Sequence, residues 1–200
     1  MRNKKNTFKE IINLFLLFIG TIFFVMLFNT TVLAKVQVEQ TSMENTLLNK
    51  QQLLVDKLSY RFSNPQREDI IIFLPDKEKG SILDESLATL DQMMSTFSHY
   101  KQKDTYYVKR VIGVAGDKVD IKNGYVYVND VKLDEPYTKG ETIEHEIHLP
   151  LTVGKNKLFV MGDHRSVSMD SRSFGVIDLN QVEGKAIFRV YPWDKVGRIQ

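Results

Sequence analysis

The pattern of hydrophobic and polar positions divides the chain into two parts. Residues 11–34 contain no charged side chain, and the run 11–28 is almost wholly apolar. As a helix, residues 11–34 would be about 36 Å long, whereas the hydrocarbon core of a bilayer is about 30 Å thick. After residue 34, short apolar runs alternate with charged positions. The pattern therefore predicts one transmembrane anchor at 11–34, followed by a folded domain at 35–200.

Basic residues set the expected orientation of this anchor. Four of them precede residue 10, whereas Lys35 is the only one between the anchor and Lys50. The positive-inside rule then makes residues 1–10 a cytoplasmic tail and places the domain on the outer face of the cell membrane. A cleaved signal peptide is the alternative, because Val-Leu-Ala at 32–34 resembles a cleavage site. The apolar run is, however, longer than the usual signal-peptide core of about 7–15 residues.

The folded domain has the pattern of a mainly β structure. Val36 and Val38 alternate with polar residues, as in a half-buried strand that leads towards Ser42. Apolar residues recur at three- and four-residue spacing in 82–97, which predicts one small helix inside a surface insertion at 75–104. Eight segments are predicted as strands: 35–40, 53–56, 69–74, 105–113, 118–121, 125–128, 158–161 and 186–191.

Composition narrows the chemistry available to this domain. The chain has no cysteine, which excludes disulfides, thiolate metal sites and a cysteine nucleophile. It has 27 Lys and Arg residues against 25 Asp and Glu residues, and the basic excess lies before residue 11. Residues 35–200 are therefore close to neutral, so no basic surface for nucleic acid is predicted.

Ser42 is a candidate nucleophile that needs a general base. Histidine is the usual partner of a catalytic serine, and the chain offers His99, His145, His148 and His164. The pair at 145 and 148 superficially resembles a zinc motif. The two histidines are three residues apart rather than four, and their segment lacks helical periodicity. A solvated loop is therefore favoured there over a metal site.

A neutral lysine is the other possible base. A free ammonium has a pKa of about 10.4, and burial lowers it because the charged form loses its water. Strand alternation would place Lys109 on one face with Tyr107 and Val111, and Arg110 on the other face. The alternative is a surface strand on which both cations are solvated.

Four segments decide between these alternatives. "SMENTLL" at 42–48, "REDIIIF" at 67–73, "VKRVIGVAGD" at 108–117 and "MGDHRSVSMDSR" at 161–172 resemble the conserved boxes of type I signal peptidases. All four occur in the family's order, after an anchor of the expected orientation. The resemblance covers the anchor and the catalytic core and leaves 75–104 unmatched.

The resemblance implies an antiparallel β catalytic domain with a Ser-Lys dyad. Ser42 would be the nucleophile, its backbone N–H an oxyanion donor, and Lys109 the general base, with no metal or cofactor. The substrates would be preproteins, with prepilins as one class, bound as an added strand and cleaved after small residues at −1 and −3. The enzyme would act as a membrane-bound monomer. The resemblance also implies supporting roles, namely orientation of the amine by Ser168 and ion pairs of Arg110 with Asp163 and of Arg172 with Asp170.

The chain departs from the family pattern at several positions. Where some members have a second oxyanion donor, this chain has Gln40, so the identity of that donor stays open. The loss of two prolines is expected to loosen two loops. The four departures within the boxes are Asn45 for proline, Glu68 for glycine, Ala115 for proline and His164 for asparagine.

Two other functions are compatible with parts of the sequence. A non-proteolytic homologue could assist pilus or surface-protein assembly, but such a protein need not retain Ser42 and Lys109. A self-cleaving repressor is disfavoured by the anchor and by the lack of a DNA-binding domain. Tyr191 and Trp193 would lie either at the membrane interface or in the core.

Overall fold

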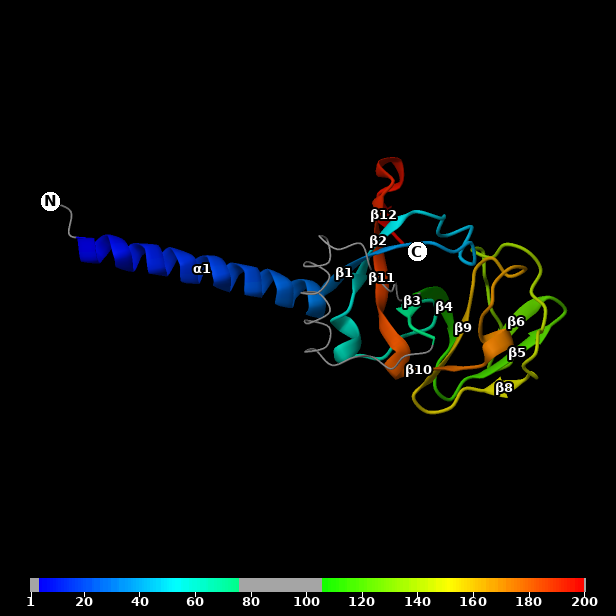
Figure 1. Cartoon of the computed structure of the whole chain (residues 1–200). Coiled ribbons are helices and arrows are strands. Elements are labelled where there is room, and N and C mark those ends of the chain that lie inside the picture. Colours follow the sequence, from blue (N-terminus) through cyan, green and yellow to red (C-terminus); the bar gives the residue numbers. More distant parts are fainter. Residues whose placement is uncertain (1–3, 76–105, 200) are drawn as a thin grey trace. The chain divides into compact units, whose positions relative to one another are not determined.

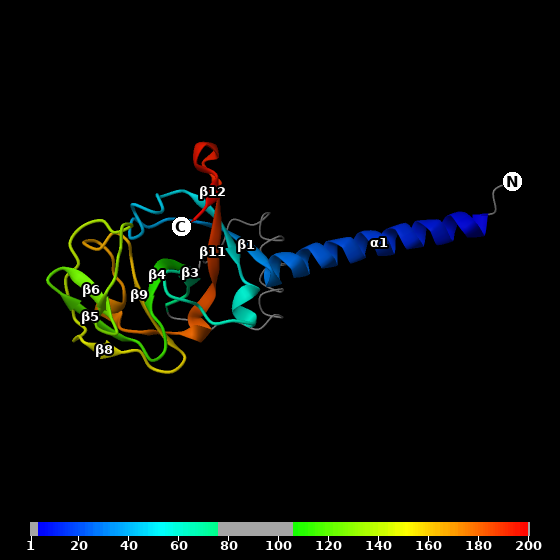
Figure 2. The ribbon, with the colours of Figure 1, turned by 180° about the vertical axis from the view of Figure 1, so that it is seen from behind.

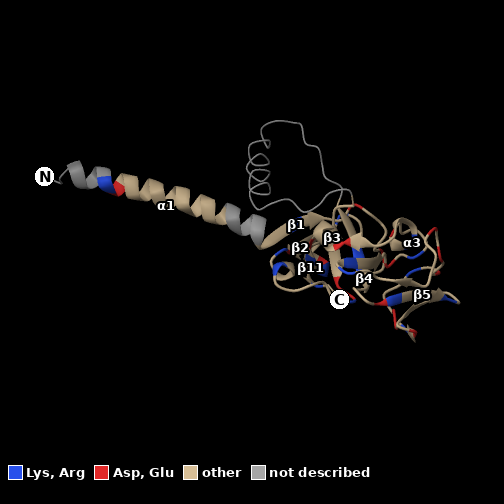
Figure 3. Ribbon diagram, turned by 90° about the horizontal axis from the view of Figure 1, so that it is seen from below, with Lys and Arg blue, Asp and Glu red and all other residues tan. Residues whose placement is uncertain are grey.

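The computed structural model describes residues 4–75 and 106–199, with backbone only for 4–8 and 26–31. Nearly all of the predicted insertion, and the whole of the predicted helix at 82–97, lie outside the described residues. Helix α1 spans Lys4–Thr31 (Figure 1). Along its described side chains, charge occurs only near the N-terminal end (Figure 3). Within the described residues, no helix is both long enough and apolar enough to qualify as a membrane span.

Helix α1 ends before the predicted anchor does. Strand β1 begins at Leu33, so Leu33 and Ala34 belong to a strand. Thr30, Thr31 and Val32 are β-branched, which lowers helix propensity at this junction.

The described residues from 34 onward form a mainly β domain, as predicted, with two sheets (Figures 1 and 2). Every strand pair whose register is described is antiparallel. The larger sheet has the order β1-β2-β11-β3-β4-β9-β10, with β12 paired to β11. Its strands are β1 Leu33–Gln37, β2 Gln52–Asp56, β3 Ile70–Phe73, β4 Tyr107–Gly113, β9 Lys157–Met161, β10 Ile177–Asp178, β11 Val182–Tyr191 and β12 Gly197–Arg198.

The smaller sheet packs against the end of the larger one, beside β9 in both views (Figures 1 and 2). Its order is β7-β6-β5-β8. Its strands are β5 Lys118–Lys122, β6 Tyr125–Val128, β7 Val131–Lys132 and β8 Leu151–Thr152. The domain also contains the short helix α3, Ser171–Phe174, and 3-10 turns at Ser59–Arg61, Leu179–Gln181 and Trp193–Lys195.

All eight predicted strands are present; β6 has the predicted ends, and the others have shifted ends. The first ends at Gln37 rather than at residue 40. The chain continues beside its neighbour, since the Val38 N–H donates to the Gln51 carbonyl at 2.9 Å. Strands β7, β8, β10 and β12 and helix α3 were not predicted, because elements of two to four residues are too short to show a periodicity.

Strands β3 and β4 lie in the interior of the larger sheet and are covered on both faces. Ile70, Ile72 and Val108 belong to one hydrophobic cluster, whereas Ile71 and Val111 belong to another. The predicted alternation along β4 is confirmed, but the alternative of a solvated surface strand is wrong. The aromatic pair at the C-terminus is exposed instead, so the alternative that Tyr191 and Trp193 pack in the core is also wrong.

Candidate active site

Ser42 and Lys109 meet in the interior of the domain. Ser42 lies in the turn 41–46 that follows β1, and Lys109 lies in the middle of β4. The Lys109 Nζ atom is 2.6 Å from the Ser42 Oγ atom. Ser42 is 7% exposed and Lys109 is 1% exposed. A serine hydroxyl at hydrogen-bond distance from a buried amine is the geometry required for transfer of the hydroxyl proton.

Burial lowers the pKa of Lys109 to about 8, as expected from the loss of hydration of the ammonium. Asp170 raises this pKa, Arg172 lowers it and Asp163 raises it, in that order of importance. Arg110 is adjacent to Lys109 in the sequence, but it is not the cation that lowers this pKa. Arg110 leaves β4 towards the opposite face, and its charge is neutralised by Asp163. Arg172 is therefore the cation that lowers the pKa of Lys109.

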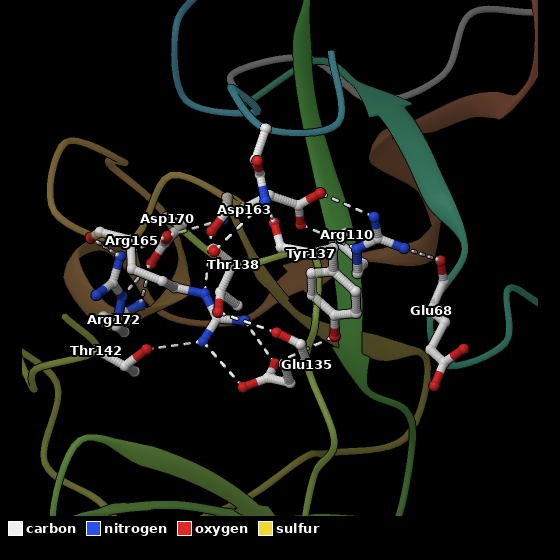
Figure 4. Close-up of polar contacts among 12 residues, drawn as sticks. Glu68, Arg110, Glu135, Tyr137, Thr138, Thr142, Asp163, Arg165, Asp170 and Arg172 are labelled. Atoms are coloured by element: carbon white, nitrogen blue, oxygen red, sulfur yellow. Dashed lines mark hydrogen bonds and ion pairs between the residues drawn. The ribbon is translucent and has the colours of Figure 1, made fainter. Parts of the chain in front are cut away.

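Arg110 and Asp163 form a buried bidentate ion pair (Figure 4). Arg110 Nε donates to Asp163 Oδ1 at 2.9 Å, and Nη2 donates to Oδ2 at 2.8 Å. The Thr46 hydroxyl also donates to Asp163 Oδ2 at 2.5 Å, and Arg110 Nη1 donates to the Glu68 carbonyl at 3.1 Å. The ring of Tyr137 lies 3.8 Å from the Arg110 Cζ atom. The predicted pair is therefore present, and it reaches the turn that carries Ser42.

Asp170 and Arg172 form the second predicted pair, and both side chains are fully buried. Arg172 Nε donates to Asp170 Oδ1, and Nη2 donates to Oδ2, each at 2.9 Å. Burial alone would raise the pKa of Asp170, but the hydrogen bonds and charge of Arg172 lower it below its ordinary value. Asp170 Oδ2 also accepts from the Gly162 N–H at 3.0 Å, so the carboxylate fixes the loop that follows β9.

Ser168 is buried, and its hydroxyl helps to lower the pKa of Asp170, but its Oγ atom makes no hydrogen bond of ordinary geometry within the described residues. The expected hydrogen bond to the Lys109 amine is therefore not formed in this structure. The described hydrogen bond of the Lys109 amine goes to Ser42 instead.

Arg165 and Glu135 form a further buried pair that the sequence did not indicate (Figure 4). Arg165 Nη2 donates to Glu135 Oε1 at 2.5 Å, and Nη1 donates to the Thr142 hydroxyl at 2.9 Å. Arg165 Nε donates to the Gly162 carbonyl at 3.1 Å. The arginine stands inside the fourth box, but its acidic partner lies outside every box, so spacing alone could not pair them.

In the part of the chain that the structure describes, no group of three or more histidine or carboxylate side chains lies together in a way that could hold a metal ion. His145 Nδ1 lies 2.9 Å from the Ser173 hydroxyl.

These residues form a candidate serine hydrolase site. A buried amine contacts a buried serine hydroxyl, and two buried ion pairs lie beside them. The family model described as "Signal peptidase, peptidase S26" matches residues 10–193. The chain therefore belongs to this family, which makes it a serine endopeptidase of the signal peptidase type.

Curated relatives agree with this assignment. The signal peptidase I of Bacillus caldolyticus is 34% identical over 168 residues, which cover 78% of each chain. The signal peptidase IB of Staphylococcus aureus is 32% identical over 170 residues, which cover 77% of this chain and 75% of the relative. A crystal structure of a signal peptidase I from Enterococcus faecalis is 28% identical, covers 62% of this chain and 97% of its own, and has a TM-score of 0.42.

Proposed function

We propose that this protein is a membrane-bound type I signal peptidase in which Ser42 is the nucleophile and Lys109 the general base. It removes signal peptides from secreted preproteins after small residues at −1 and −3. The observation that carries the proposal is the 2.6 Å contact between Lys109 Nζ and Ser42 Oγ. Neither the relatives nor the described residues favour a non-proteolytic assembly factor.

The reaction follows from the protonation state of Lys109. A neutral amine accepts the proton of Ser42 while the Oγ atom attacks the carbonyl carbon of the scissile peptide bond. The resulting ammonium returns this proton to the leaving amine, and an acyl-enzyme forms. Lys109 then takes a proton from water, whose oxygen attacks the ester. The signal peptide leaves with a free carboxyl group, and the Lys109 ammonium returns its proton to the departing Ser42 Oγ atom, which restores the starting enzyme.

The negative charge on the substrate carbonyl oxygen needs a fixed donor. In the described part of the chain, the N–H of Ser42 makes no backbone hydrogen bond. We assign it as the oxyanion donor. The pairs of Arg110 with Asp163 and of Arg172 with Asp170 are assigned as supports of the loops around Ser42 and Lys109.

The membrane topology belongs to the same proposal. Residues 1–10 form a cytoplasmic tail, 11–34 a single-pass anchor and 35–200 the outer catalytic domain, with an insertion at 75–104. The charge asymmetry around the apolar run supports this orientation. Exposed Tyr191 and Trp193 have the amphipathic chemistry of membrane-interface residues. The enzyme acts as a monomer on preproteins, prepilins included, that bind as an added strand.

The test uses the full chain in detergent and a peptide with alanine at −1 and −3. Ser42→Ala removes the nucleophile and Lys109→Met removes the base, so both variants should be inactive. Lys109→Arg should also be inactive, because arginine stays protonated and cannot accept a proton. Lys118→Met removes a half-exposed lysine of β5 that pairs with Asp130, and this variant should retain full activity. Mass spectrometry should place the cut after the −1 alanine. More than a few per cent of wild-type activity in Lys109→Arg would refute the neutral-lysine mechanism.

The topology has its own test in intact cells. Protease added outside should digest residues 35–200 and spare the N-terminal tail. Protection of the large domain would contradict the proposed orientation.

A further inference from the structure

Asn45 stands where the family has a proline, and the structure gives it a conformation that proline cannot adopt. Its φ angle is 105°, which lies in the left-handed region that favours glycine. Proline is restricted to a φ of about −65°. The turn 41–46 is therefore built differently here from a turn that contains proline, and something other than a pyrrolidine ring must hold it.

The Asn45 side chain, which is exposed, supplies that restraint. Its Nδ2 atom donates to the Tyr137 carbonyl at 2.9 Å and approaches the Thr138 carbonyl at 3.4 Å. These acceptors lie 92 and 93 residues further along the chain. The amide therefore fastens the turn that carries Ser42 to a segment outside all four boxes.

The segment 135–139 is itself firmly held. Lys139 donates its N–H to the Asp163 carbonyl at 2.8 Å and accepts at its carbonyl from the Arg165 N–H at 2.7 Å. Tyr137 stacks on Arg110, which is paired with Asp163, as Figure 4 shows. Asn45 therefore binds to segment 135–139, which is held in place by the same Arg110–Asp163 pair that lies beside the active site.

The two neighbours of Asn45 contact segment 135–139 and the adjoining Asp163. Lys139 Nζ lies 3.0 Å from Glu44 Oε2, and Thr46 donates to Asp163. The lysine is half-exposed, and ion pairs of this kind contribute little. Thr46 belongs to the family box, so Asn45 is the restraint that this chain adds.

We propose that Asn45 is a positioning residue: its amide fixes the turn 41–46 on segment 135–139 and so sets the direction of the Ser42 hydroxyl. The inference rests on the proposed role of Ser42 as the nucleophile. The turn links the residues that flank Asn45 and Ser42, because the N–H groups of Thr46 and Leu47 both donate to the Met43 carbonyl, at 3.1 and 2.8 Å. A change at residue 45 therefore passes to the residue that follows the nucleophile.

The experiment compares Asn45→Gly, Asn45→Asp and Asn45→Pro with the wild type. Glycine keeps the φ angle and loses the amide, whereas aspartate keeps the shape and cannot donate to the two carbonyls. Both variants should lower kcat about tenfold or more and change KM less than twofold, since small misplacements of reacting groups cost large factors in rate. Their melting temperatures should stay within about 4 °C of the wild type, roughly the effect of 1 kcal/mol in a domain of this size. Asn45→Pro should lose more activity than either.

Asn49 is the matched control, because it is exposed in the same region and its side chain has no described partner. Asn49→Gly and Asn49→Asp should keep the wild-type kcat. Wild-type kcat in either Asn45→Gly or Asn45→Asp overturns the proposal, as does a loss that merely follows the unfolded fraction. If Asn45→Pro does not fold, these two variants still decide. Ser42→Ala in the same assay tests the role of Ser42 as the nucleophile separately. Activity in this variant would refute the proposed function itself, whereas the Asn45 variants test only the positioning role of Asn45.

Discussion

Gly162 packs directly against the backbone carbonyl of Ser42. A Cβ atom at residue 162 would overlap this carbonyl oxygen and the Oγ atom of Ser168. His164 donates its N–H to the same Ser42 carbonyl at 3.0 Å. The backbone of the nucleophile therefore rests on the loop that follows β9, and the gap between them accommodates no side chain.

Gly162→Ala should consequently damage activity far more than stability. The added methyl group displaces Ser42, and a misplacement of about 1 Å can cost about 100-fold in rate. Overpacking should cost about 1–3 kcal/mol of unfolding free energy. Peptide cleavage and thermal melting measure the two effects. Gly154→Ala is the control, because its new Cβ would meet only the Lys157 Cδ atom, at 3.9 Å. Equal loss of activity in both variants would refute this account.

Several features of this site could be predicted from the sequence. Strand alternation placed Lys109 and Arg110 on opposite faces of β4, and the structure confirms it. Alternation could not show that both faces are buried, because burial depends on strands distant in sequence that cover the sheet. The same limit applies to Asn45, whose acceptors lie some ninety residues away. The backbone conformation at 45 also could not be predicted, so the absence of proline suggested a loose loop where the structure has a tether.

Glu68→Gly should stabilise the protein. Glu68 replaces a family glycine and has a φ angle of 72°, which costs a residue with a side chain about 1–2 kcal/mol. Its backbone hydrogen bonds, to the Val111 carbonyl at 2.8 Å and from Arg110, do not need the carboxylate. The melting temperature should rise by about 2–4 °C per kcal/mol. Glu68→Ala keeps the strain and should show no gain. If alanine stabilises as much as glycine, removal of the carboxylate is the cause.

Ala115→Pro should also stabilise, in contrast to Asn45→Pro. The N–H of Asp117 donates to the Val114 carbonyl at 2.9 Å, and Gly116 has a φ angle of 91°. These are the features of a type II turn, in which proline is favoured at the second position. The expected gain is about 0.4–1 kcal/mol, through a more restricted unfolded chain. Urea unfolding measures it. Gly116→Ala should destabilise the same turn, and a stabilising effect there would exclude this turn type.

The last prediction concerns the proton on Lys109. Activity needs the neutral amine, so kcat/KM should rise with pH around an apparent pKa of about 8. Because burial lowers the folded pKa below the ordinary lysine value of 10.5, the unfolded chain binds more protons between pH 8 and 10.5. Lys109 therefore opposes folding by about 3 kcal/mol below pH 8, and this penalty disappears as the pH rises to 10.5. Lys109→Met removes the titration. Subtracting its unfolding free energy from that of the wild type should give a difference that rises between pH 8 and 10.5 and is flat below pH 7. A flat difference throughout, or a kcat/KM midpoint near 10.5, would show that the lysine is not desolvated.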